Sequence, residues 1–412
     1  MDRVILHSDM NSYYASVEMM LNPKLKGKVM AVSGSTENRN GIILAKSEKA
    51  KKAGVKTGMA LWEARQVCPD IVIVPPQYEE YIKYSKIARD IYARYTDRVE
   101  SLGMDECWLD VTESVGLFGD GEKIAEEIRR TIKNELGLTV SVGVSYNKIF
   151  AKLGSDMKKP DAVTVITRDN FKEKVWPLPV GDLLLVGRAT RSKLNRCGVN
   201  TIGDLAKYPD IYLKSKFGKN GLLIASYARG QDIAPVTAID YRMPIKSVGH
   251  GITCVADLEN NTEVFAVMQE LTQEIGYKLR KHGLAARGVQ ISVRDKNLFD
   301  KQWQRQMEHS TQCASDISAA AKQLFADSYR WTENVRSVTV RAINLIPAEM
   351  PTQLSFFDDV EKRERALRLE NTIDEIRRRF GYKAVTYATL MGDLKMPDYS
   401  DYRPKMPALA SR

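Results

Sequence analysis

The sequence predicts a multi-domain α/β (α+β) protein, for three reasons. The chain has 412 residues, more than the ~100–200 residues of a typical domain. Segments with strand and helix periodicity alternate between residues 3 and 145, which is typical of an α/β domain. Between residues 247 and 348 the order is strand, helix, strand, strand, helix, strand, which predicts a small domain of one sheet and two helices.

The composition excludes several classes of protein. Hydrophobic residues make up 43% and charged residues 28% of the chain, as in ordinary soluble proteins. No apolar run approaches the ~20 residues of a membrane helix, and no signal peptide follows Met1, so we expect a cytoplasmic protein without a membrane segment. The five cysteines form no C-x-x-C pair, which argues against structural zinc and disulfides. The excess of 62 Lys and Arg over 52 Asp and Glu is typical of proteins with a polyanionic partner, although many basic enzymes bind no nucleic acid.

The elements of the N-terminal part follow from their periodicity. Residues 3–9 contain the apolar run Val4-Ile5-Leu6 and end in Asp9, which predicts a buried strand. Aromatic and aliphatic residues recur at three- and four-residue steps over 77–97, which predicts an amphipathic helix. Two short strands flank Gly103 within 99–112. The other expected elements are helices over 12–20, 45–53, 59–67 and 121–135 and a strand over 139–145.

Three carboxylates are candidate catalytic residues. Asp9 ends the first strand, and Asp105 and Glu106 follow the turn at Gly103. Adjacent strand residues point to opposite faces, so Asp105 and Glu106 converge only where the strand bends. If the first strand lies beside this hairpin, the three acids meet at one sheet edge, where two Mg²⁺ ions could clamp the oxygens of a phosphoryl transfer. Solvated acids at turns are the alternative interpretation at this point.

The second half of the chain begins with short helices and glycine turns from about residue 167. Between Asp182 and His250 it contains eleven Lys or Arg, five Asp and no Glu. The stretch 234–246 contains two prolines and lacks helical periodicity, which predicts a linker. The elements expected beyond its first strand are helices over 263–281, 313–325 and 361–380 and strands over 288–294, 302–309 and 335–344.

Three segments carry a specific pattern: Asp9–Glu18, Ser101–Thr112 and Ser141–Pro160. Together they resemble the Y-family of translesion DNA polymerases, in its bacterial UmuC/DinB-like (impB/mucB/samB) branch. The resemblance covers about residues 1–348 and implies a right-hand polymerase with a palm, small fingers, a helix-hairpin-helix thumb and a βαββαβ little finger. The implied boundaries are palm 1–10 and 77–166, fingers 11–76, thumb 167–233, linker 234–246, little finger 247–348 and C-terminal tail 349–412.

The resemblance implies roles for the palm residues. Asp9, Asp105 and Glu106 are then the catalytic acids, which bind two Mg²⁺ ions together with the backbone carbonyl of Met10. Tyr14 is the steric gate, a ring beneath the sugar that collides with the 2′-hydroxyl of a ribonucleotide. Tyr13 presents its backbone to the triphosphate. Without the resemblance, an aromatic residue at position 14 would be interpreted as part of the core.

The resemblance also implies a triphosphate site. Lys159, directly before Pro160, neutralises charge that builds on pyrophosphate, although a lone surface lysine is the alternative. The fingers depart from the family pattern, because Ala45, Glu48 and Lys51 stand where many relatives carry Thr, Tyr and Arg. Lys51 supplies a positive charge but cannot form the bidentate hydrogen bonds that an arginine makes to a phosphate. Ala45 and Glu48 cannot take over the other two roles.

Two glycine turns in the thumb resemble helix-hairpin-helix elements. They lie in Leu183–Leu194 and Phe217–Gly221. Glycine lets backbone N–H groups approach a DNA phosphate, although glycine turns between helices are also common without DNA. The expected DNA contacts of the thumb and little finger are Gly187, Arg188, Arg191, Lys193, Lys216, Lys219, Arg287 and Arg294.

One short motif follows the little finger. The sequence Gln353-Leu354-Ser355-Phe356-Phe357 resembles the bacterial sliding-clamp-binding pentapeptide. In that interpretation Leu354 and Phe357 fill apolar pockets and Gln353 forms hydrogen bonds, with Phe356 part of the same segment. The alternative is a chance match in a buried loop.

The sequence therefore predicts a template-directed, error-prone DNA polymerase that extends primers across damaged template by two-metal phosphoryl transfer. We expect a monomer that binds primer–template DNA, deoxynucleoside triphosphates and a sliding clamp, without a proofreading exonuclease. A catalytically inactive DNA-binding accessory is a second hypothesis, which the intact Asp9, Asp105 and Glu106 disfavour. A two-metal nuclease is a third, in which Tyr14 and Lys159 would have no purpose.

Overall fold

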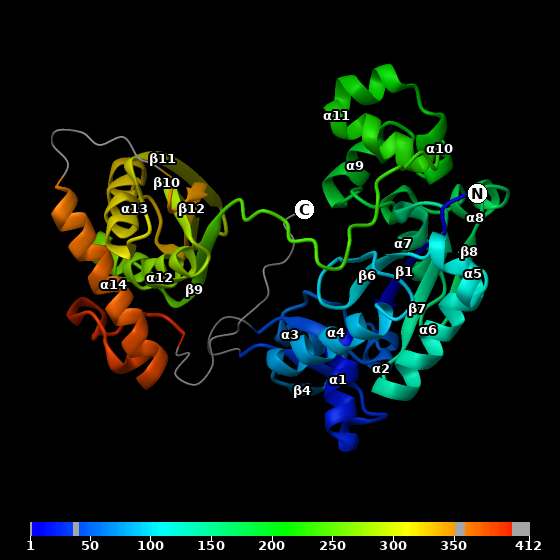
Figure 1. The fold of residues 1–412 in the computed structure, drawn as a ribbon, viewed down its shortest axis with the longest axis horizontal. Coiled ribbons are helices and arrows are strands. Elements are labelled where there is room, and N and C mark those ends of the chain that lie inside the picture. Colours follow the sequence, from blue (N-terminus) through cyan, green and yellow to red (C-terminus); the bar gives the residue numbers. More distant parts are fainter. Residues whose placement is uncertain (1, 36–40, 351–358, 398–412) are drawn as a thin grey trace. The chain divides into compact units, whose positions relative to one another are not determined.

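The computed structural model describes residues 2–35, 41–350 and 359–397. These residues divide into two compact units (Figure 1). The first contains residues 2–33 and 42–242, and the second contains residues 243–397. The division falls within the stretch for which the sequence predicts a linker.

A five-stranded sheet forms the centre of the first unit, in the order β5-β6-β1-β7-β8. The central strand β1 (Ile5–Met10) is antiparallel to both of its neighbours, β6 (Glu106–Asp110) and β7 (Val140–Ser145). The edge strands are β5 (Val99–Ser101) and β8 (Val163–Ile166). The expected position of the first strand beside the Gly103 hairpin is therefore confirmed, whereas β8 was not predicted.

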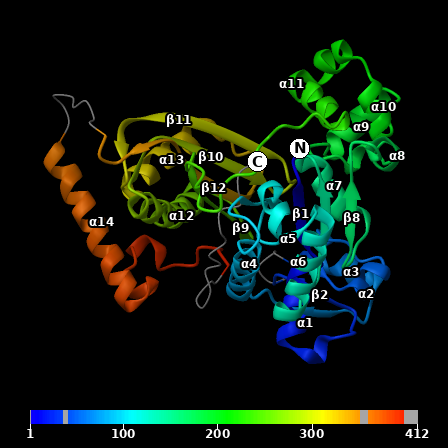
Figure 2. The same cartoon turned by 45° about the vertical axis from the view of Figure 1, so that its right-hand side comes forward.

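Helices cover both faces of this sheet. On one face, α4 (Tyr78–Tyr92) and α6 (Gly121–Leu136) share a core with alternate residues of β1 (Figure 2). On the other face, α7 (Lys148–Met157) packs very closely on the sheet. A Cβ atom on Gly143 would lie 1.9 Å from the Ala151 carbonyl oxygen, so only glycine permits this approach. The close packing brings side chains of α7 over the Asp9 face of β1.

A small three-stranded sheet lies in the part predicted as fingers. Its order is β3-β2-β4, with β2 (Met30–Ser33), β3 (Ile43–Lys46) and β4 (Val72–Val74). The predicted helix over 45–53 is wrong at its start, because residues 45 and 46 pair with β2 and the helix begins only after the N-cap Ser47. Strands this short leave no usable periodicity in the sequence. The helices are α1 (Tyr13–Leu21), α2 (Glu48–Lys52) and α3 (Leu61–Val67).

Four helices follow the palm sheet and share one core with residues of α7 and β8. A glycine separates two helical stretches within the last of them, because Gly218 has a φ of +63°, a conformation that glycine adopts without strain. This break lies within the predicted second hairpin. The helices are α8 (Phe171–Val175), α9 (Arg188–Arg196), α10 (Ile202–Lys207) and α11 (Asp210–Ala228).

The first part of the predicted linker 234–246 lies against the palm. Val236 is buried in a cluster with Trp108 of β6. The Thr237 N–H donates a hydrogen bond to the Glu100 carboxylate, with an N···O distance of 3.0 Å. Residues of the linker are therefore part of the first unit as far as position 242.

The second unit has the expected βαββαβ order. Its four strands form an antiparallel sheet in the order β11-β10-β12-β9, and both helices lie on one side of it (Figure 2). Strand alternation places Val289, Ile291 and Val293 in the core beneath these helices. The elements are β9 (Val248–Leu258), α12 (Asn261–Lys281), β10 (Leu284–Asp295), β11 (Asp300–Thr311), α13 (Ala314–Ser328) and β12 (Val335–Pro347).

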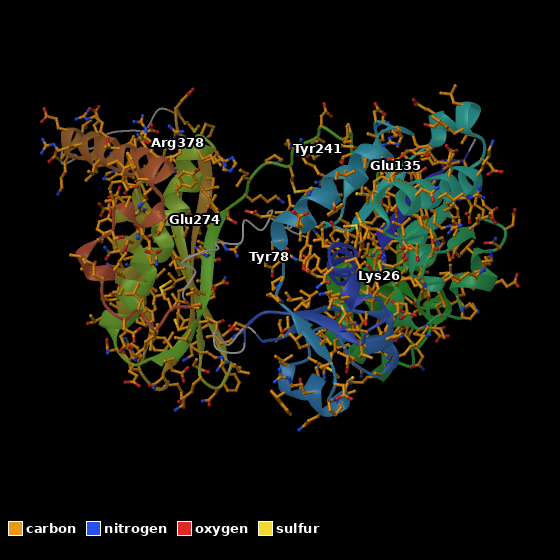
Figure 3. All side chains as sticks on the ribbon, turned by 90° about the horizontal axis from the view of Figure 1, so that it is seen from below. Lys26, Tyr78, Glu135, Tyr241, Glu274 and Arg378 are labelled. Atoms are coloured by element: carbon orange, nitrogen blue, oxygen red, sulfur yellow. The ribbon has the colours of Figure 1, made fainter. Side chains whose placement is uncertain are left out.

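The last long helix, α14 (Val360–Phe380), packs on this unit. The buried Arg280 of α12 forms ion pairs with Glu370 and Asp374 of α14, and Glu370 also accepts a hydrogen bond from the first N–H of α13. Figure 3 labels Glu274 on α12 and Arg378 on α14. The helix predicted over 361–380, within the expected C-terminal tail 349–412, is confirmed as α14. In the described part of the chain, no helix is long and apolar enough to cross a membrane.

Candidate active site

Asp9 and Glu106 lie opposite each other on adjacent strands. They are direct partners in the β1–β6 register, so their side chains share the face that α7 covers. Asp105 directly precedes β6, and its carbonyl oxygen accepts a hydrogen bond from the Met10 N–H at 2.9 Å. The turn before it contains Gly103 with a φ of +93°. The three predicted acids therefore meet where β1 ends and β6 begins. This end of the central strands is called the palm edge below.

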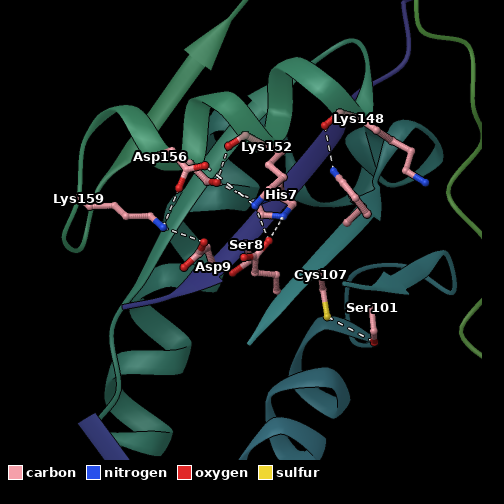
Figure 4. Close-up of polar contacts among 12 residues, drawn as sticks. His7, Ser8, Asp9, Ser101, Cys107, Lys148, Lys152, Asp156 and Lys159 are labelled. Atoms are coloured by element: carbon pink, nitrogen blue, oxygen red, sulfur yellow. Dashed lines mark hydrogen bonds and ion pairs between the residues drawn. The ribbon is translucent and has the colours of Figure 1, made fainter. Parts of the chain in front are cut away.

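Two lysines from α7 and the turn that follows it contact these acids (Figure 4). Lys159 Nζ lies 2.7 Å from Asp9 Oδ2 and 2.8 Å from Asp156 Oδ1. Lys152 forms a short ion pair with Glu106. The predicted site lysine, Lys159, thus contacts Asp9, and Lys152 is a second cation at these acids that the sequence analysis did not identify.

Burial and neighbouring charges change the pKa values of the three acids. It raises the pKa of Asp9 to about 6, although Lys159 acts in the opposite direction. Burial and the neighbouring Asp9 and Glu106 raise the pKa of Asp105 to about 6. Burial disfavours the charge of Glu106 too, but His7 and Lys152 together lower its pKa to about 2. At neutral pH the edge therefore holds more negative charge than its lysines compensate.

His7 lies fully buried beneath this edge. Its Nδ1 shares a hydrogen bond with Ser155 Oγ at 2.8 Å, and its Nε2 lies 3.3 Å from Glu106 Oε2. Burial lowers the pKa of His7 to about 4, so its ring is neutral at neutral pH. Lys152 of α7 therefore holds Glu106 through an ion pair, and the neutral His7 ring packs beside it.

The donor chemistry of the edge suits a divalent cation. Among residues 2–35, 41–350 and 359–397, no three His, Cys, Asp or Glu side chains are arranged as a ready-made metal site. Asp9 and Glu106 are paired with lysines instead. Their oxygens are nevertheless the hard ligands that Mg²⁺ prefers. Burial, together with the neighbouring acids, raises the pKa of Asp9 and Asp105, and a bound cation would favour their charged forms.

The Tyr14 ring is held in a fixed orientation. It stacks on the Tyr81 ring of α4, with ring centroids 4.2 Å apart and an angle of 9° between the planes. The Tyr81 hydroxyl donates to the buried carboxylate of Glu18, and the Tyr13 hydroxyl donates to the Tyr81 carbonyl oxygen. Burial raises the pKa of Tyr14 to about 12, so its hydroxyl stays protonated. An aromatic stack anchored by Glu18 thus supports the predicted gate.

The fingers present two lysines and one acid on β3 and α2. Glu48 Oε1 accepts a hydrogen bond from Ser12 Oγ at 3.0 Å. Lys51 is exposed in the last turn of α2. Burial and the nearby Lys51 lower the pKa of Lys46, which lies on β3. Lys46 is a further cation of this region that the sequence analysis did not single out.

The candidate DNA contacts lie on exposed surface. Gly187 is the N-cap residue of α9, and Lys216 Nζ donates to Cys197 Sγ at 3.2 Å. On β10, Arg294 forms an ion pair with Asp300 at 2.8 Å. The proposed clamp segment 353–357 lies outside the described residues. The exposed candidates are Gly187, Arg188, Arg191, Lys193, Lys216, Lys219, Arg287 and Arg294.

Comparison with known proteins matches both ends of the chain to one family. The impB/mucB/samB family model matches residues 8–156, and the model of its C-terminal domain matches residues 245–356. The chain is 51% identical to DNA polymerase IV of Acetivibrio thermocellus, over 95% of this chain and 98% of that protein. The chain belongs to the impB/mucB/samB family. It is thus a DNA-directed DNA polymerase of the Y-family, as the sequence analysis predicted.

Further comparisons agree with this assignment. The chain is 32% identical to DNA polymerase IV of Clostridium acetobutylicum, over 95% of this chain and 99% of that protein. Residues 181–232 match the thumb-domain model of DNA polymerase iota. A solved Y-family DNA polymerase chimera shares the fold, with a TM-score of 0.74, 24% identity and coverage of 83% of this chain and 99% of that one. The predicted right-hand polymerase architecture is confirmed.

The sequence analysis missed the residues that support the acids. Strand alternation places His7 on the same face as Asp9, two residues away. Helical spacing places Lys152 and Asp156 on one face of α7. Both signals were present in the sequence, but they gain meaning only once α7 is known to cover this face of β1.

Proposed function

We propose that this polymerase carries out error-prone, template-directed synthesis across damaged DNA by phosphoryl transfer with two Mg²⁺ ions. The proposal rests on the position of Asp9, Asp105 and Glu106, which lie together with Lys159 at the palm edge. Asp9, Asp105 and Glu106, with the Met10 carbonyl, would hold the metal ions. When bound, the ions would supply electrostatic stabilisation of the attacking and leaving oxygens.

The protein groups around the reaction have separate roles in this proposal. Lys159 neutralises charge on the leaving pyrophosphate as the primer 3′-oxygen attacks the α-phosphorus. Lys152 holds Glu106 in a fixed orientation through an ion pair. Tyr14 lies beneath the sugar, and its stack on Tyr81 keeps the ring from turning aside. Tyr13 contributes backbone to the triphosphate site, and Lys51 contributes charge.

The remaining partners follow from exposed surface and from the short motif. The thumb and little-finger cations contact phosphates of primer–template DNA and make no base-specific contacts. Gln353, Leu354, Phe356 and Phe357 bind a sliding clamp, which would retain a weakly held enzyme near the primer end. The enzyme acts as a monomer in the cytoplasm, on DNA.

Running-start primer extension across defined lesions tests the proposal. The wild-type protein should extend past at least one lesion in the presence of Mg²⁺ and misincorporate on undamaged template, and Asp105→Ala should extend on neither. Degradation of the labelled primer without nucleotides would indicate a nuclease instead. Failure of the wild-type protein to extend any primer, with DNA binding intact, would support an inactive accessory.

A further inference from the structure

The turn that carries Lys159 is fixed to the palm through Asp161. The Asp161 carboxylate accepts hydrogen bonds from two cations of α6, Arg129 Nη1 at 2.7 Å and Lys133 Nζ at 2.6 Å. Its backbone is in the left-handed region, with a φ of +57°, where Asp and Asn are the side-chain-bearing residues most often found. Asp161 is therefore held by both its side chain and its backbone geometry.

The same residue also joins this turn to the end of β1. The Asp161 N–H donates to Asn11 Oδ1 at 2.9 Å. Asn11 is buried, and its Nδ2 group donates to Ser141 Oγ of β7 at 2.9 Å. Asn11 lies two residues after Asp9. The turn is thus fixed to the strand that carries one of the catalytic acids.

The charges around Asp161 explain how an acid is tolerated here. A carboxylate two residues from a triphosphate-binding lysine would repel the nucleotide if it were uncompensated. Although partial burial disfavours its charge, the hydrogen bonds from Lys133 and Arg129 lower the pKa of Asp161. Arg129 also pairs with Glu126, at 2.9 Å. Two cations therefore offset the Asp161 carboxylate, and α6 forms the outer support of the turn.

We propose that Asp161 is a positioning residue for the incoming nucleotide, which fixes Lys159 against the end of β1 and acts through that lysine. The inference rests on the proposed role of Lys159 at the triphosphate. An ordered turn spares the nucleotide the conformational entropy of ordering the Lys159 side chain on binding. The residue should therefore affect nucleotide affinity more than the rate of the chemical step.

Single-nucleotide incorporation under pre-steady-state conditions, on a short primer–template, separates the two quantities. Asp161→Ala should raise the nucleotide Kd by about fivefold to tenfold and change the maximal rate by less than about threefold. Asp161→Asn, which tolerates the same backbone conformation, should recover part of that affinity. Arg129→Ala should weaken binding more than Asp161→Asn, because it leaves the carboxylate with less compensation.

The matched control is Arg130→Ala, one residue further along α6, because the Arg130 side chain is 71% exposed. It should leave both Kd and rate unchanged. The double variant Arg129→Ala/Asp161→Asn should lose less affinity than the sum of the single changes, since both act on one turn. Thermal melting of each variant checks that the fold is intact.

Lys159→Met distinguishes failure of this inference from failure of the proposed function. An unchanged nucleotide Kd in Lys159→Met would overturn the role of Lys159 and remove the basis of the inference. A raised Kd in Lys159→Met together with an unchanged Kd in Asp161→Ala would overturn the inference alone. So would an Asp161→Ala protein that loses rate at unchanged Kd, or one whose defect follows a lowered melting temperature.

Discussion

The palm edge and the thumb surface proposed to contact DNA are organised in opposite ways. At the palm edge, Asp9 is only 6% exposed, and its carboxylate lies 2.7 Å from Lys159 Nζ. In the thumb, Arg188, Arg191 and Lys193 are all exposed on one short helix. In the proposed function, the first region therefore depends on a few buried groups, whereas the second depends on many solvated cations.

This difference predicts how each region responds to mutation. A buried, paired carboxylate has no substitute, because a neighbouring group cannot move into its place in a packed interior. An exposed lysine or arginine contributes one phosphate contact among several. Single changes should therefore be severe in the palm and mild in the thumb.

The largest expected effect comes from Asp105→Asn. Removal of a ligand carboxylate should slow nucleotide addition by roughly a thousandfold or more, because the lost interaction acts mainly in the transition state. Single-turnover incorporation with saturating DNA measures the rate. A variant with more than a tenth of wild-type activity would place the chemistry elsewhere.

The next largest effect concerns sugar selection by Tyr14. Tyr14→Ala should reduce discrimination against ribonucleotides on the order of a hundredfold, with a smaller loss for deoxynucleotides, because the ring acts by collision. Incorporation of matched ribo- and deoxynucleotides measures the ratio. Tyr14→Phe is the control and should keep the discrimination, since it keeps the ring. If Tyr14→Ala discriminates as well as the wild type, the residue belongs only to the core.

The proposed clamp motif should affect retention on DNA and leave the chemistry unchanged. Alanine at Gln353, Leu354, Phe356 and Phe357 should remove stimulation by a bacterial clamp, expected to be about tenfold or more from tethering, and leave synthesis on a short primer unchanged. Extension assays with and without clamp measure both. Equal losses in the two assays would show that these residues are structural.

The palm acids should also affect the stability of the metal-free protein. Asp9 and Asp105 have pKa values of about 6 in the folded state, against an ordinary value of 3.8. The folded state thus binds protons more tightly, so the free energy of unfolding should fall as pH rises from about 4 to about 6, by roughly 2–3 kcal/mol per acid at most. Glu106, with its lowered pKa, acts in the opposite direction below pH 4.5.

Asp105→Asn is the variant that tests this effect. It should melt at a higher temperature than the wild type at pH 7 without metal, and the difference should shrink toward pH 4. Mg²⁺ should stabilise the wild type more than the variant. Melting curves at several pH values, with EDTA or Mg²⁺, supply the data. A variant that is less stable than the wild type at pH 7 would contradict the assigned charge imbalance.

The smallest expected effects are those of single thumb cations. Arg188→Ala or Lys193→Ala should weaken DNA binding only about twofold to fivefold and reduce the salt dependence of binding by about one counterion. Fluorescence anisotropy across a salt series measures both. A hundredfold loss of DNA affinity from one such change would mean that DNA binding depends on a few residues of the thumb.

Much of the fold could be predicted from the sequence, where periodicity is long or repeated. The βαββαβ order and the amphipathic helix at α4 follow from such patterns. The sheet of the fingers could not be predicted, because β2, β3 and β4 have only three or four residues each. The docking of α14 could not either, since it depends on Arg280 reaching Glu370 across 90 residues of sequence.

The candidate site shows the same limit. Asp9, Asp105 and Glu106 were candidates from their positions at strand ends, whereas the roles of Tyr14 and Lys159 came only from the family motif. Their supporting residues could not be derived, because support is a property of contact between elements distant in the sequence. Glu18, for example, anchors the Tyr14 stack through Tyr81, 63 residues away.

Parallel measurements on Asp105→Ala and Arg191→Ala test the contrast between the two regions most directly. For each protein, the incorporation rate at saturating DNA and the DNA Kd are determined under the same salt conditions. Asp105→Ala should lose nucleotide addition and keep its DNA Kd within about threefold, whereas Arg191→Ala should keep the rate and lose about twofold to fivefold in Kd. An Asp105→Ala protein that extends primers normally, or an Arg191→Ala protein that cannot incorporate at saturating DNA, would contradict the account.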